Sequence, residues 1–138
     1  MNEEVQALLR RARRFLRAAE NQLRSDFPEE AASRAYYAMF TAARALLLRT
    51  TPEVSRHEHV KREFEELFVK TGRIERRFLT YLEVGLLSRH FADYETDLTY
   101  VATREEAVSR LREASEFVGM AENFLKAAGG GLELGQRT

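Results

Sequence analysis

Apolar residues recur along this chain at intervals of three and four, which is the spacing of one face of an α-helix. Runs of alternating β-branched residues bounded by turn signals, which would indicate strands, are missing from the sequence. The sequence therefore predicts an all-α fold. The first apolar stripe falls in an expected helix over about residues 3–24 and consists of Val5, Leu8, Leu9, Ala12, Phe15, Leu16, Ala19 and Leu23.

Two prolines and a glycine separate the next two expected helices. Pro28 suits the first turn of a second helix over about residues 28–49. Pro52 disfavours helix at the residue before it, and Gly72 is a natural left-handed end for a third helix that starts near residue 56. The stripe of the second helix is Ala32, Ala35, Tyr36, Met39, Phe40, Ala43, Leu46 and Leu47.

Two more helices complete the expected bundle. The fourth starts near Ile74, and its apolar stripe leads to Arg89, which lies within the same arc of the helix. The last covers about residues 103–127, where Thr103 and Glu106 form a capping-box pattern. Its inward face is expected to consist of Val108, Leu111, Ser115, Val118, Ala121 and Leu125.

Composition limits the class of protein. The sequence predicts one helical domain over residues 1–127 and a disordered glycine-rich tail over 128–138. The absence of cysteine excludes disulfides and thiolate chemistry. The formal net charge is zero, from 22 basic and 22 acidic residues, so the overall field does not steer the chain toward nucleic acid or a membrane. No apolar run approaches the roughly 20 residues of a membrane helix, and we expect a soluble cytoplasmic protein.

Four arginines of the first helix lie off its apolar stripe. Such a basic face can contact phosphates, but it can equally be a solvated face balanced by nearby glutamates. The sequence favours the solvated face. The arginines are Arg10, Arg13, Arg14 and Arg17.

Polar and ionisable residues gather where the fourth helix ends, in the stretch SRHFADYETDLTY over residues 88–100. Arg89 and Asp93 are four residues apart, so they can meet on one helix face. In one interpretation Arg89 binds a phosphate and Asp93 orients its guanidinium group. In the other, the two residues form an ion pair that closes the helix end. An arginine aligned with an apolar stripe needs a partner in a cleft or across an interface.

Three segments together resemble the HEPN superfamily, and in particular its small stand-alone prokaryotic branch. They are AASRAYYAMFTAARALL over residues 31–47, RHEHVKREFEELFVKTGRI over 56–74 and LLSRHFADYE over 86–95. The resemblance implies an antiparallel up-down bundle of four main helices with one additional short helix. It also implies a homodimer with a functional groove where the subunits meet, and a minimal nucleotidyltransferase as partner in a toxin–antitoxin-like module.

Catalytic relatives are metal-independent ribonucleases whose signature is an arginine, four to six other residues and a histidine. None of His57, His59 and His90 follows an arginine at that spacing. Arg89 matches the motif arginine, but Tyr94 stands where the shortest motif would have histidine. The ordinary pKa of tyrosine is about 10, against about 6.5 for histidine, so tyrosine is poorly suited to shuttle a proton at pH 7.

The leading hypothesis is therefore a nucleotide- or RNA-binding protein that works with a nucleotidyltransferase in a toxin–antitoxin-like or defence module. One alternative is a ribonuclease with a degenerate site, in which His90 or His57 replaces the missing histidine. Another is a non-catalytic dimeric scaffold. His57 and His59 would point about 200° apart on a helix, which makes them a poor metal pair, and we expect neither a metal nor a cofactor.

The expected nucleotide- or RNA-binding residues are Arg89, Asp93, Tyr94 and Tyr37. Tyr37 lies off the centre of the second-helix stripe and could line a groove beside Arg89. The resemblance further implies that a tyrosine beyond the motif can be modified with AMP by the partner enzyme. Tyr94 and Tyr100 are the candidate acceptors in this sequence.

Overall fold

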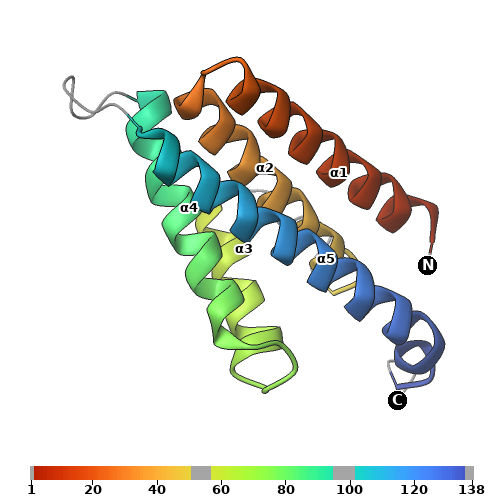
Figure 1. Cartoon of the computed structure of the whole chain (residues 1–138). Coiled ribbons are helices and arrows are strands. Elements are labelled where there is room, and N and C mark those ends of the chain that lie inside the picture. The colour runs from red at the N-terminus through yellow and green to blue at the C-terminus, as the bar shows by residue number, and fades with distance from the viewer. Residues whose placement is uncertain (1, 51–56, 95–101, 136–138) are drawn as a thin grey trace.

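The described part of the chain is helical throughout (Figure 1). The structure is a computed structural model that describes residues 2–50, 57–94 and 102–135, with no description of the side chains at 57, 88–94 and 129–135. These ranges contain no strand, which confirms the all-α prediction. The elements are α1 (Glu3–Arg24), α2 (Pro28–Leu47), α3 (His57–Phe64), the π-helical turn η1 (Glu65–Val69), α4 (Arg76–Tyr94) and α5 (Arg104–Gly135).

Four main helices form an antiparallel bundle around α2. Consecutive main helices run in opposite directions, and α2 packs against α1, α4 and α5 and against the short helix α3 (Figure 1). Small side chains make this central position possible, because alanine lets a neighbouring helix approach closely. All eight residues of the predicted α2 stripe are buried, and so are Ala31, Ala38, Ala42 and Ala45 on its other sides.

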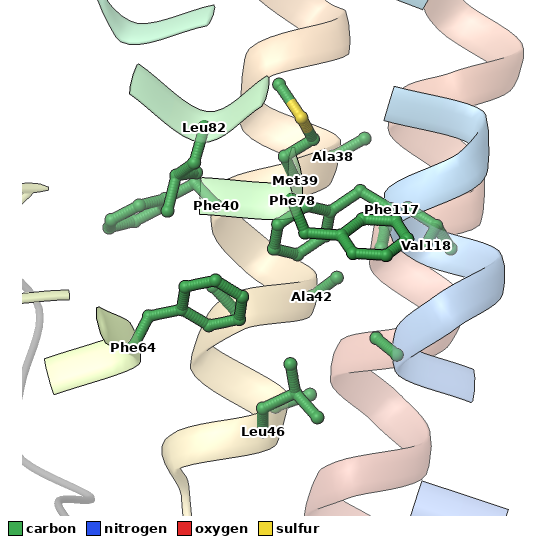
Figure 2. Close-up of a cluster of buried hydrophobic side chains, with 14 of the residues drawn as sticks. Ala38, Met39, Phe40, Ala42, Leu46, Phe64, Phe78, Leu82, Phe117 and Val118 are labelled. Atoms are coloured by element: carbon green, nitrogen blue, oxygen red, sulfur yellow. The ribbon is translucent and has the colours of Figure 1, made fainter. Parts of the chain in front are cut away.

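Three phenylalanine rings join the short helix to the rest of the core. Phe64 of α3 lies 5.4 Å from Phe117 of α5, and Phe78 of α4 lies 6.0 Å from the same ring, as measured between ring centroids. Figure 2 shows these rings beside Met39 and Ala42 of α2. Aromatic pairs at such separations add stabilisation beyond the apolar area that they bury. The three rings therefore connect α3, α4 and α5 through one contact cluster.

α4 lies close to side chains of α2 at Gly85. A Cβ atom added there would lie 2.6 Å from Cε of Met39 and 3.2 Å from Cδ1 of Tyr36. The predicted stripe of α4 is confirmed up to this point, since Ile74, Phe78, Leu82 and Gly85 are buried and Tyr81 is half-buried. Gly85 thus lets the last turns of α4 lie close to α2.

The third helix differs from its prediction as a single helix up to Gly72. α3 ends at Phe64, and the backbone continues as η1, where the amide of Lys70 donates to the carbonyl oxygen of Glu65 at 2.8 Å. The wider turn buries both Phe68 and Val69. Gly72 has a φ of +78°, which confirms its expected role as the left-handed terminator.

The inward face of α5 is rotated relative to the prediction. Val108 is 45% exposed and Ser115 is also exposed, so the prediction that they face inward is wrong. Ala107 and Ala114 are buried in their place, because small residues allow α5 to lie close to its neighbours. Leu111 is half-buried, and the predicted inward positions Val118, Ala121 and Leu125 are confirmed.

Both ends of α5 can be compared with the sequence prediction. At its start, the amide of Glu106 donates to Oγ1 of Thr103 and the amide of Thr103 donates to Oε1 of Glu106, each at 3.0 Å, which confirms the capping box. At its other end, the helix continues to Gly135, whereas the sequence predicted helix to about residue 127 and a disordered tail beyond it. Each added helical residue gains one backbone hydrogen bond, which offsets the helix-breaking tendency of glycine.

Candidate functional site

The predicted binding group lies in the last two turns of α4, which ends at Tyr94. This end of α4 lies beside the beginnings of α2 and α5 (Figure 1). The close contact at Gly85, one turn earlier, sets its distance from α2. The predicted residues within these turns are Arg89, His90, Asp93 and Tyr94.

The side chains of this group lie outside the described residues, so its geometry stays a prediction. The helical backbone supports one part of it, because residues 89 and 93 are four apart in a continuous helix. Tyr100 lies outside the described residues altogether. His57 is the first residue of α3, and its side chain is not described either.

Tyr37 belongs to the side of α2 that faces α1. Its ring stacks on Phe15 of α1, with centroids 5.7 Å apart and an angle of 28° between the ring planes. It also meets the ring of Tyr36 edge-on at 5.8 Å. The contact between α2 and α4 at Gly85 involves Tyr36 and Met39. The described ring contacts of Tyr37 are therefore with α1 and α2.

A second cluster of charged residues surrounds the outer side of α1. It lines a groove of about 910 Å³, which also has Leu8 and Phe15 in its wall. We name this surface the arginine face. Its charged members are Arg10, Arg11, Arg13, Arg14 and Arg17 of α1, Arg34 of α2 and Glu122 of α5.

One arginine of this face is held by the single carboxylate in the groove lining. Arg13 donates to Glu122 from Nε at 2.9 Å and from Nη2 at 2.6 Å, which is a bidentate pair. These hydrogen bonds lower the pKa of Glu122 from its ordinary value and raise the pKa of Arg13. Because of this pair, α1 and α5 are joined across the groove.

The other arginines of the face are exposed to solvent. Among the residues that the structure describes, no carboxylate lies within ion-pair distance of Arg10, Arg14, Arg17 or Arg34. The sequence identified the basic character of α1, but it did not show that Arg34 joins it. That residue comes from the signature segment of α2, and only the packing of α2 on α1 brings it to the same groove.

The described residues offer little for a metal ion or a membrane. Among the side chains that the structure describes, no three acidic or histidine groups are placed to hold a metal. His59 is exposed on α3. No helix within residues 2–50, 57–94 and 102–135 combines the length and the apolar character that crossing a membrane requires.

The arrangement is an all-α bundle with an arginine in the last turns of α4, and comparison with known proteins identifies its class. The model of the HEPN domain matches residues 5–130. The chain belongs to the HEPN family. This result confirms the resemblance that the three sequence segments indicated.

Three relatives match most of the chain. "Putative toxin MJ0142" of Methanocaldococcus jannaschii is 32% identical over 122 residues, which cover 88% of this chain and 82% of the relative. "Putative toxin MJ0605" of the same organism is 36% identical over 126 residues, or 91% and 92% of the two chains. A "UPF0332 protein" of Thermotoga maritima is 32% identical over 130 residues, which is 92% of each chain.

Proposed function

We propose that this protein is a HEPN-type partner of a minimal nucleotidyltransferase in a toxin–antitoxin-like or defence module. The observation that carries the proposal is the HEPN match over nearly the whole helical domain, together with two relatives named as toxins. In the proposed module the nucleotidyltransferase is the partner protein that the resemblance to stand-alone HEPN proteins implies.

The proposed ligand is a nucleotide or RNA, bound in a groove that contains the end of α4. Arg89 binds a phosphate, because a planar guanidinium group matches two phosphate oxygens at once. Asp93 follows one turn later in α4 and orients that arginine. Tyr94 contributes a hydroxyl group or a ring face to the same ligand, whereas the ring of Tyr37 stacks on Phe15 of α1.

The groove is completed by a second copy of the chain. We propose a homodimer, because an arginine in register with the buried stripe of α4 needs a partner across an interface. Tyrosine at position 94 makes proton transfer at neutral pH unfavourable. The proposed role of the groove is therefore binding, with modification by the partner enzyme as its regulation.

Co-expression with the nucleotidyltransferase encoded beside this chain tests the proposal. We expect expression of this protein alone to arrest growth, and co-expression to relieve the arrest and to add AMP, seen as an increase in intact mass. The variants Tyr94→Phe and Tyr100→Phe separate the two candidate acceptors. Tyr81→Phe is the matched control, because Tyr81 lies on the same helix and its hydroxyl donates to Glu116 at 2.9 Å.

Other outcomes would favour the alternatives. Cleavage of RNA by the purified protein, lost in Arg89→Ala, would identify a ribonuclease with a degenerate site. A protein that neither associates with the nucleotidyltransferase nor binds nucleotide or RNA would be a scaffold. In either case the proposed function would be wrong, while the family assignment would be unaffected.

A further inference from the structure

The arginine face of α1 has no part in the function proposed above. Residues 5–19 contain five arginines and no acidic residue, although the whole chain has no net charge. The positive charge is therefore segregated onto one surface. Arginines three and four residues apart on a helix repel one another. A face of this kind destabilises the isolated helix and suits an external anion.

The geometry of the face fits a linear anion. Arg10, Arg14 and Arg17 are exposed along one side of α1, and residues 10 and 17 are about 10 Å apart along the helix axis. A nucleic-acid strand carries one phosphate per roughly 3.4 Å of its axis, so this span covers about three phosphates. Arg34 of α2 widens the charged surface to one side.

We propose that the arginine face binds the phosphate backbone of a nucleic acid, at a site separate from the end of α4. Arginine forks contact two phosphate oxygens at once, and four exposed forks line α1, while that of Arg13 is held by Glu122. Phe15 is half-buried in the groove wall and supplies an apolar contact for a base or sugar. The site reads charge and shape rather than base sequence.

A protein partner fits this face less well. The fully buried core of a stable protein interface is more apolar than the rest of the surface, although arginine is enriched at such interfaces. Here the apolar members of the groove lining other than Ala7 are buried or half-buried, and five of its six arginines are exposed. A two-fold dimer through the face would place the arginines of one copy opposite those of the other. A proposed homodimer therefore leaves this surface free.

Binding of a labelled single-stranded RNA of about 20 nucleotides tests the proposal, measured by fluorescence anisotropy between about 50 and 200 mM salt. The variant Arg10→Gln/Arg14→Gln/Arg17→Gln is expected to lower affinity at least about tenfold. Its plot of log affinity against log salt should lose about two units of slope, at about 0.7 per lost phosphate contact. A DNA of the same sequence is expected to behave similarly, because the contacts are to phosphates.

The matched control removes the same charge elsewhere. Arg62, Lys70 and Arg76 are exposed around α3, η1 and the start of α4, away from the groove. The variant Arg62→Gln/Lys70→Gln/Arg76→Gln should keep the wild-type salt slope. Circular dichroism spectra and melting temperatures of both triple variants establish that they are folded.

A variant that is expected to bind RNA more tightly gives a second test, which does not depend on a loss of affinity. Glu122→Gln removes the single carboxylate in the groove lining and releases Arg13 from its bidentate pair. We expect this variant to bind the RNA several-fold more tightly, with a salt slope steeper by about 0.7. Adding Arg13→Gln to Glu122→Gln should remove the extra slope.

Several results would overturn the inference. The arginine triple variant could bind as the wild type does, the control triple could lose as much affinity, or Glu122→Gln could bring no gain. Competition by polyglutamate as strong as that by RNA at equal charge would identify an acidic protein surface as the ligand. The arginine variants should still associate with the nucleotidyltransferase, so failure of this inference is distinguishable from failure of the proposed function.

Discussion

On the α4 side of α2, side chains pack so closely that one added carbon atom at Gly85 would meet Met39 at 2.6 Å. On the outer side of α1, a groove of about 910 Å³ is open to solvent and lined by arginines. The closed α4 side depends on apolar packing, whereas the open groove side carries a partly exposed ion pair between Arg13 of α1 and Glu122 of α5. Close apolar packing and exposed positive charge thus lie on different sides of the bundle.

The largest effect is expected from Phe117→Ala on the closed side. The ring of Phe117 is fully buried between Phe64 and Phe78, and its removal leaves a cavity. We expect the free energy of unfolding to fall by about 3–5 kcal/mol, as measured by urea denaturation. Phe27→Ala is the control, because Phe27 is 54% exposed and its loss should cost less than about 0.5 kcal/mol. Equal losses in the two variants would contradict the comparison.

A smaller effect is expected from Gly85→Val, which adds volume where α4 meets α2. Overpacking should lower the free energy of unfolding by about 1–3 kcal/mol. Gly119→Val is the matched control on α5, because no atom lies within 4 Å of a Cβ added at Gly119. That control should stay within about 0.5 kcal/mol of the wild type in the same denaturation experiment. If the control lost as much, the contact of α4 with α2 would not explain the loss at Gly85, since valine has a higher helix propensity than glycine and propensity favours both variants.

The smallest effect is expected from Glu122→Gln on the open side. Arg13 and Glu122 retain 42% and 30% of their side-chain exposure, so solvent screens their attraction. We expect a loss of only about 0.5 kcal/mol at pH 7 in chemical denaturation. A loss comparable to that of Phe117→Ala would show that the ion pair between Arg13 and Glu122 contributes more to stability than its solvent exposure indicates.

The same pair gives this contribution a pH dependence. The guanidinium group of Arg13 lowers the pKa of Glu122 in the folded state, so the folded carboxylate holds its proton less tightly than the unfolded one. The stabilisation is therefore fully present above the unfolded pKa of about 4.5 and is lost as the pH falls through the lower folded value. The difference between wild type and Glu122→Gln should vanish in that acidic range. A difference that persisted there would point to packing instead of charge.

The closed side could be predicted from the sequence more fully than the open side. The stripe of α2 and the terminator Gly72 were correct, because buried apolar residues and a positive φ each leave a direct signal in the sequence. The inward face of α5 was not, since the pattern favours the larger Val108 while the bundle buries the smaller Ala107. Which of two adjacent residues faces inward depends on how closely the neighbouring helices approach.

Some features of the structure depend on tertiary packing and leave no signal in the local sequence pattern. Arg34 joins the arginines of α1 only because α2 packs beside that helix, and spacing along the chain does not indicate this. The π-helical turn η1 also has no signal in the local pattern, since its extra residue serves the burial of both Phe68 and Val69. The group at Arg89 remains a prediction of the sequence.

The central position of α2 has a consequence for how the protein opens. Because α2 packs against α1, α3, α4 and α5, it keeps contacts with the others when one outer helix moves away. Its amide hydrogens should therefore exchange with solvent deuterium only when the whole domain unfolds. Partial unfolding is therefore confined to the outer helices. An outer helix such as α1 can then move away while α2 keeps its backbone hydrogen bonds.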